Sequence, residues 1–259
     1  MSTERPQLGE GLLEPQRLSR QLSTLLAAEI VSGRIGVGES FASSEEIVNR
    51  YSVSRTVARE TVQALAMLGM VNVQHGKRTE VRPPEEWDIL SSVVQEAMRR
   101  EGKEEPLLRD LYEFRLLIEP QAAGWMAEYA DNAELAELAE LAERMARLAK
   151  DDAALHHLME ADRSFHNLVA RASGNQVVRA VSRDIREVIG TLWGFSAMDA
   201  VAATKVAEQH QRIAVAVAQG DAAAATEAMR DHLLWAAQAD LHGLGEPSGL
   251  RFLPRTAAS

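Results

Sequence analysis

The sequence predicts a mainly α-helical protein of two domains, an N-terminal winged helix-turn-helix and a C-terminal all-α bundle of six or seven helices. The chain has 259 residues, which is long for one helical core. Hydrophobic residues make up 46% and aromatic residues only 5%, and Ala and Leu are abundant, so helices are favoured over sheets. The alternation typical of strands is confined to a short stretch after residue 70, and no strand signal follows residue 85.

The first two helices of the N-terminal domain are expected near residues 15–32 and just after Ser43. Residues 1–14 lack periodicity and are interpreted as a disordered tail. Residues 15–32 place leucines and an isoleucine on one helical face, and Gly33 is a plausible stop. Ser43 and Glu46 have the S-x-x-E spacing of a capping box, which predicts that a short second helix begins there.

A third helix and a hairpin complete this domain. The third helix is expected from Ser54 to Leu68, because Val57, Thr61 and Leu65 share one face and Gly69 follows. In MVNVQHGKRTEVRP the valines alternate, and His75-Gly76-Lys77 is expected to form the turn. Three helices followed by a two-stranded ribbon predict a winged helix-turn-helix over residues 15–82.

The C-terminal part is expected to be helical throughout. Residues 83–106 are interpreted as a linker that contains the first helix of this domain, over 85–101, and residues 107–243 as the remaining bundle. Breaks at Gly, Asn, Asp and Lys residues divide the bundle, with helices expected at 107–129, 132–150, 152–173, 175–195, 200–218 and 221–241. Residues 244–259 are rich in small residues and are expected to be a mobile tail.

Charge is distributed unevenly between these two parts. The net charge of −10 argues against nucleic-acid binding, but residues 14–82 carry nine basic and seven acidic side chains. This segment is therefore +2, and the remainder must be −12. Because DNA phosphates repel acidic surfaces, any DNA contact is expected in the first eighty or so residues.

The third helix carries the side chains expected to read DNA. Ser54, Arg55, Thr56 and Arg59 place hydroxyl and guanidinium donors at its N-terminal end, where they could contact bases in the major groove. The turn residues His75, Gly76 and Lys77 could approach the DNA backbone or the minor groove. Taken alone, Arg55 and Arg59 would more often be solvated surface charges, but the order of helices and wing favours DNA contact.

Residues 15–82 closely resemble the DNA-binding domain of GntR-family regulators, most clearly in VSRTVARETVQAL and VQHGKRTEV. The second of these segments is similar to the wing of the FadR branch. The resemblance implies DNA contacts from Arg55, Thr56, Arg59, His75 and Gly76.

One departure stands out: the family usually has Arg after Glu in a segment like LPSERELA, whereas this chain reads FASSEEIV and has Glu45 there. A carboxylate is repelled by phosphate, so Glu45 either reads a cytosine amino group or accompanies a shifted geometry.

Four residues of the C-terminal domain have a spacing suited to a metal ion. Asp162 and His166 lie four residues apart on one helix face. His210 and His232 lie at similar distances on either side of the Gly220-Asp221 turn, so they are expected at nearly the same depth on antiparallel helices. Three imidazoles and one carboxylate suit Zn²⁺, with Ni²⁺ or Mn²⁺ as alternatives, and leave positions open for water or ligand oxygens. A single buried histidine is more often only hydrogen-bonded.

Three segments of this domain resemble the FCD ligand-binding domain of the same branch: LYEFRLLIEP, ADRSFHNLVARASGN and AEQHQRIAVAVAQGDAAAATEAMRDHL. The resemblance implies that Asp162, His166, His210 and His232 hold a metal. It also implies that Arg115 grips the carboxylate of a small effector. The alternative for Arg115 is a salt bridge to Glu119, four residues further along the helix. His156 and His157 are interpreted as surface or outer residues.

Together these patterns predict a DNA-binding transcription regulator, interpreted as a repressor of a catabolic operon that a small organic or sugar acid releases from DNA. We expect a cytoplasmic protein, because there is no signal peptide, no membrane-spanning run and no cysteine. We also expect a homodimer on a palindromic operator, because a single DNA-binding domain offers only a few base contacts, and we expect no enzymatic activity. The alternatives are an acyl-CoA-responsive regulator without metal, a metal-dependent hydrolase and a structural helical adaptor. The absence of an HExxH motif and of paired ExxH motifs weighs against the hydrolase.

Overall fold

The computed structural model describes residues 15–73, 78–151, 155–193 and 199–241. It divides into two compact units, Met1–Glu104 and Glu105–Ser259. Both ends predicted to be disordered or mobile, and the predicted wing turn with His75, Gly76 and Lys77, lie outside the described residues. In the described ranges, no helix is both long and apolar enough to cross a membrane.

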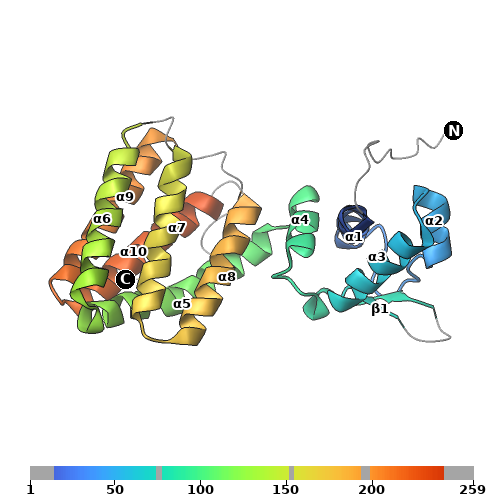
Figure 1. Cartoon of the computed structure of the whole chain (residues 1–259), viewed down its shortest axis with the longest axis horizontal. Coiled ribbons are helices and arrows are strands. Elements are labelled where there is room, and N and C mark those ends of the chain that lie inside the picture. The colour runs from blue at the N-terminus through green and yellow to red at the C-terminus, as the bar shows by residue number, and fades with distance from the viewer. Residues whose placement is uncertain (1–14, 74–77, 152–154, 194–198, 242–259) are drawn as a thin grey trace, which may run out of the picture. The chain divides into compact units, whose positions relative to one another are not determined.

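The first unit is the predicted winged helix-turn-helix (Figure 1). Its elements, in chain order, are α1 (Pro15–Val31), α2 (Ser44–Tyr51), α3 (Arg55–Met67), β1 (Val71–Asn72), β2 (Glu80–Val81), η1 (Pro84–Glu86) and α4 (Ser92–Arg100). The two strands pair antiparallel with Val71 opposite Val81. Leu22, Leu26 and Ile47 are fully buried beside Leu65 and Val57 of α3, so α1, α2 and α3 share one core.

Local capping places α2 and α3. The capping box predicted at Ser43 is present: the Ser43 amide donates to Glu46, and the Glu46 amide donates to the Ser43 hydroxyl. α3 begins after Ser54, whose hydroxyl accepts from the Val57 amide at 3.2 Å. Gly69 ends this region with φ +70°, and a Cβ there would lie 2.0 Å from the Glu86 carbonyl oxygen, so only glycine fits.

The helix expected to open the C-terminal domain belongs instead to the first unit. Within the predicted 85–101, α4 covers only Ser92–Arg100, and η1 precedes it. Val94 and Ala97 are fully buried in the core of the first unit. Arg34 pairs with Glu101 through two bonds of 3.2 and 2.9 Å, which ties the end of α4 to the loop after α1. The expectation was wrong because an apolar helix face does not specify which domain will cover it.

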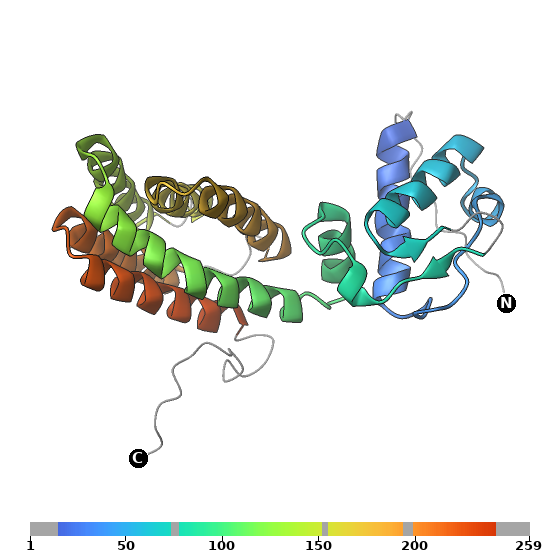
Figure 2. The ribbon, with the colours of Figure 1, turned by 90° about the horizontal axis from the view of Figure 1, so that it is seen from below.

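The second unit is a bundle of helices, as predicted. The described residues form α5 (Glu105–Tyr129), α6 (Asn132–Leu148), α7 (Leu155–Ala172), α8 (Gln176–Trp193), α9 (Ala200–Ala218) and α10 (Ala222–Leu241). α5 and α10 run side by side in both views (Figures 1 and 2). They approach closely at Gly124, where a Cβ would lie 2.6 Å from the Thr226 hydroxyl. α7, α8 and α9 also contact α5, so this long helix forms one wall of the bundle interior.

Candidate metal and effector centre

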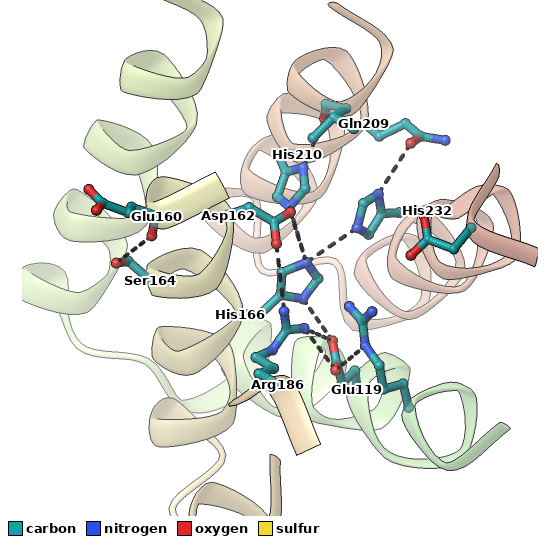
Figure 3. Close-up of polar contacts among 12 residues, drawn as sticks. Glu119, Glu160, Asp162, Ser164, His166, Arg186, Gln209, His210 and His232 are labelled. Carbon is teal, nitrogen blue, oxygen red and sulfur yellow. Dashed lines mark hydrogen bonds and ion pairs between the residues drawn. The ribbon is translucent and has the colours of Figure 1, made fainter. Parts of the chain in front are cut away.

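The four predicted metal ligands meet inside the second unit. Asp162 and His166 lie on α7, His210 on α9 and His232 on α10, and one ligand atom from each lies within 4.8 Å of all the others. His166, His210 and His232 are buried, whereas the Asp162 side chain is 20% exposed. Figure 3 shows the three imidazoles and the Asp162 carboxylate pointing toward one another. The spacing argument across the Gly220-Asp221 turn therefore placed these side chains correctly.

The Nε2 atoms of the three imidazoles converge. His166 Nε2 lies 3.1 Å from His210 Nε2 and 3.2 Å from His232 Nε2. Asp162 Oδ1 lies 3.2 Å from His210 Nε2. Metal–nitrogen bonds of about 2.0–2.1 Å place neighbouring ligand atoms roughly 3.0–3.4 Å apart in octahedral or tetrahedral geometry. These three separations match that spacing, whereas Asp162 Oδ1 lies 3.7 Å from His166 Nε2.

The other ring nitrogen of each histidine faces an acceptor. His210 Nδ1 lies 2.8 Å from the Val206 carbonyl oxygen, and His166 Nδ1 lies 2.7 Å from Glu119 Oε2. His232 Nδ1 lies 3.2 Å from the side-chain oxygen of Gln209. Because oxygens of this kind only accept, each Nδ1 carries the proton and each Nε2 presents a lone pair. Three lone pairs that face one another repel unless a cation lies between them, so this donor set fits a metal ion.

The ionisation of these groups is also the one that a metal requires. Burial lowers the pKa of His166, and the nearby charge of Arg186 lowers it further. Burial, together with the neighbouring imidazoles, holds the pKa of His232 well below its usual value. Burial alone would raise the pKa of Asp162, but His166 and His210 keep it well below the usual range. These directions favour neutral imidazoles at His166 and His232 and an ionised carboxylate at Asp162 at neutral pH.

Two buried arginines share one carboxylate beneath these ligands. Arg115 Nε donates to Glu119 Oε1 at 2.8 Å. Arg186 Nη2, from α8, lies 2.8 and 2.7 Å from the two oxygens of Glu119. Although burial alone would raise the pKa of Glu119, the two arginines hold it well below the usual value. The salt bridge that was the alternative for Arg115 is thus present, and Arg115 also lies 5.1 Å from the centre of the Tyr112 ring.

Sequence reasoning missed three residues near the site: Arg186, Tyr112 and Asp240. Arg186 follows the buried positions Ser182 and Ile185 of α8, so an arginine beside an apolar stripe was the available signal. Tyr112 is buried and donates to the Asp240 carboxylate of α10. Burial raises the pKa of Asp240 to about 7. His156 and His157 are exposed, as expected, and His242 lies outside the described residues.

The residues predicted to contact DNA are exposed where the structure describes them. Ser54, Arg55, Thr56 and Arg59 occupy the cap and first turns of α3, with their exposed side chains on the side away from the core. Glu45 is exposed in the first turn of α2. Hydrogen bonds with Ser43 and, to a smaller extent, the charge of Arg78 lower the pKa of the neighbouring Glu46 carboxyl.

A winged helix-turn-helix joined to a helical unit with such a centre defines a DNA-binding transcription regulator. Comparison with known proteins gives the family. Residues 18–81 match the model for bacterial regulatory proteins of the gntR family, and residues 110–234 match the model for the FCD domain. The chain belongs to the GntR family, and its C-terminal unit is an FCD domain. The predicted family and fold class are therefore confirmed.

Named relatives and solved structures show the same architecture. The transcriptional repressor NanR of Citrobacter rodentium is 26% identical over 246 residues, which are 91% of this chain and 90% of NanR. The galactonate operon transcriptional repressor of Escherichia coli is 24% identical over 157 residues, which are 61% of this chain and 67% of that repressor. The structure of Lar, which controls expression of the Listeria monocytogenes agr system, matches with a TM-score of 0.58 at 15% identity. It covers 92% of this chain and 100% of Lar, and this likeness shows the fold alone.

Proposed function

We propose that this regulator holds a divalent metal at Asp162, His166, His210 and His232 and that a small organic or sugar acid binds there to change DNA affinity. The observation that carries the proposal is the convergence of three Nε2 atoms, while the Nδ1 atom of each ring lies within 3.2 Å of an oxygen. When bound, the metal would supply open positions for carboxylate or hydroxyl oxygens. Zn²⁺ is the first choice for this donor set, with Ni²⁺ or Mn²⁺ as alternatives.

The class of effector is proposed from charge. Arg115 and Arg186 offset Glu119 and Asp162, so a bound divalent cation brings these four residues and the metal to a net charge of +2. An uncompensated buried charge is costly, and an anionic ligand removes that cost. Arg115 is the proposed carboxylate anchor that sequence reasoning identified. The relative named for the galactonate operon supports a sugar acid as one member of this class.

The DNA-contact residues are proposed to be Ser54, Arg55, Thr56, Arg59, His75, Gly76 and Lys77. Exposure of the first four at the start of α3 supports their part of the proposal. The protein is proposed to act as a homodimer on a palindromic operator, because one winged unit offers few base contacts. Repression, with release by the acid, is the proposed sign, and the relatives named as repressors support it. The cytoplasmic location stays a prediction.

Three measurements test this function. Elemental analysis of protein purified without chelator should find about one divalent metal per chain. Calorimetry with metal-loaded protein should detect the binding of acids such as gluconate, galactonate, lactate, malate and citrate. Footprinting on the upstream region of the gene should locate an operator, and these acids should release the protein from it. Binding of only acyl-CoA to metal-free protein would favour the acyl-CoA alternative, and turnover in a hydrolase panel would favour the enzyme. Absence of any footprint would favour the helical adaptor.

A further inference from the structure

Arg186 is the least satisfied charged group at the centre. Its side chain is 6% exposed, and it is the residue that α8 contributes to the network drawn in Figure 3. Nη2 bonds both oxygens of Glu119. Nη1 lies 3.7 Å from Asp162 Oδ2, which is beyond normal hydrogen-bond distance. Nε is buried and has no acceptor among the residues that the structure describes.

An unpaired donor of this kind is expensive. A buried polar group without a partner costs about 1–3 kcal/mol, and more when it belongs to a charged side chain. The Nε–H of Arg186 lies on the same edge of the guanidinium as Nη2 and is buried. Native proteins leave few such groups unpaired, and each exception calls for an explanation, such as strain, a functional role or a bound water or ion. Arg115 differs, because its Nε already donates to Glu119 Oε1.

Arg186 also lies beside the one candidate metal ligand that is partly exposed. Of the four candidate metal ligands, Asp162 is the one that is partly exposed, at 20%, and it is the one that lies next to Arg186. A ligand that binds beside Asp162 would therefore lie next to Nη1 of Arg186. Nη1–H gains a close acceptor if that ligand carries a carboxylate.

We propose that Arg186 is the residue that binds the effector carboxylate, through Nη1–H, while Glu119 keeps Nη2. This inference rests on the proposed acid-responsive function and deepens it. It changes the role of Arg115, which then orients Glu119 instead of holding the effector. It also means that the acid joins α8 to the ligand-bearing helix α7, since Arg186 and Asp162 come from these two helices.

The test compares acid binding by metal-loaded wild-type protein with binding by Arg186→Lys and Arg186→Gln. The probes are gluconate and galactonate, with glucitol and galactitol as neutral counterparts, and calorimetry gives Kd. We expect Kd for the acids to rise about tenfold to hundredfold in both variants, because charged hydrogen bonds are lost. The matched control is Arg183→Gln, one turn away on α8 and 61% exposed, which should leave Kd unchanged. Metal content and thermal midpoint are measured for every variant.

The outcomes separate this inference from the proposed function. If wild-type protein binds neither acid, the proposed function fails and the inference falls with it. If the acids bind, but metal-loaded Arg186→Lys has the wild-type Kd, only the role of Arg186 is overturned; a lower thermal midpoint would then mark it as structural. If the variants do not fold, the arginine Nε–H signals of ¹⁵N-labelled wild-type and Arg183→Gln protein decide. In both proteins, the Nε–H signal of a buried arginine should shift when gluconate is added but not when glucitol is added. The absence of a shift with gluconate would overturn the proposal.

Discussion

Glu119 Oε2 lies 2.7 Å from Nδ1 of His166, whose Nε2 faces His210 and His232. The same carboxylate accepts bonds from Arg115 and Arg186. Glu119 therefore orients a metal ligand and also balances the two buried guanidinium groups. A single residue of α5 links the metal set to the residues that are proposed to sense an acid.

Replacing Glu119 with Gln should weaken metal binding about 10–100-fold, because the orienting partner of a ligating histidine loses its charge. The two arginines would also lose their shared counter-ion, so the thermal midpoint should fall. Competition with a chelator measures the metal affinity. The control is Glu128→Gln on the same helix, where the side chain is exposed. Unchanged metal affinity in Glu119→Gln would show that the contact with His166 does not tune the site.

Replacing His210 or His232 with Ala should remove the metal and the stability that it adds. A metal that binds only the folded state raises stability by mass action. Wild-type protein should therefore melt higher with Zn²⁺ than with a chelator, whereas either variant should show the same midpoint in both. His156→Ala is the control, because that imidazole is exposed on α7. A retained Zn²⁺-dependent shift in the His232→Ala protein would argue against its role as a ligand.

Loss of Arg55 or Arg59 should weaken specific DNA binding. Each Ala substitution is expected to cost about 1–3 kcal/mol if the arginine is bidentate to guanine, and to relax sequence preference. Lys77→Ala should weaken all sequences alike and flatten the dependence on salt, because a phosphate contact carries no base information. Fluorescence anisotropy on the operator and on scrambled DNA separates these effects. Full operator affinity in the Arg55→Ala, Arg59→Ala double variant would exclude α3 as the reading helix.

Replacing Glu45 with Arg should tighten binding to non-specific DNA, because it exchanges a repelled carboxylate for a donor to phosphate. Glu45 is exposed in the first turn of α2, beside the capping residue Glu46, so the substitution leaves the capping box intact. Affinity for scrambled DNA, measured over a range of salt concentrations, should rise most at low salt. An affinity that does not change would place Glu45 away from the DNA.

Asp240 should make stability decrease as the pH rises. Burial raises the pKa of Asp240 from 3.8 to about 7 in the folded protein. The hydrogen bond from Tyr112 and the charge of Arg115 oppose this rise, and the charge of Asp162 adds to it. The folded state therefore binds a proton that the unfolded state releases between about pH 4 and 7. Asp240 therefore contributes at most about 4 kcal/mol to the free energy of unfolding. This contribution is fully present below pH 4 and is lost as the pH rises through 7.

Asp240→Asn removes this titration and should flatten the change in unfolding free energy between pH 5 and pH 8. Urea unfolding of metal-loaded protein at both values gives the comparison with wild type. Asp184→Asn, at an exposed residue of α8, is the control. The same pH dependence in wild-type and Asp240→Asn protein would mean that Asp240 titrates near its ordinary value.

Helix positions, the winged unit and the metal set were predictable because each has a local or periodic signal. The capping box at Ser43, the spacing of Asp162 and His166, and the matched distances of His210 and His232 from one turn need only helix geometry. The assignment of α4 failed because its apolar face, with Val94 and Ala97, fits a core in either unit. Only the packing of the chain shows that this face lies against α1.

The sequence by itself determined the family, the order of the helices and the residues able to hold a metal. The tertiary structure decided which charges share a partner. Arg115 and Glu119 are four residues apart, so their pairing was foreseeable, but Arg186 lies 67 residues beyond Glu119 and reaches it from another helix. Likewise, Tyr112 and Asp240 are separated by 128 residues. Such pairs depend on how the helices pack. Burial strengthens the interactions between these charges, and it arises only when the bundle has formed.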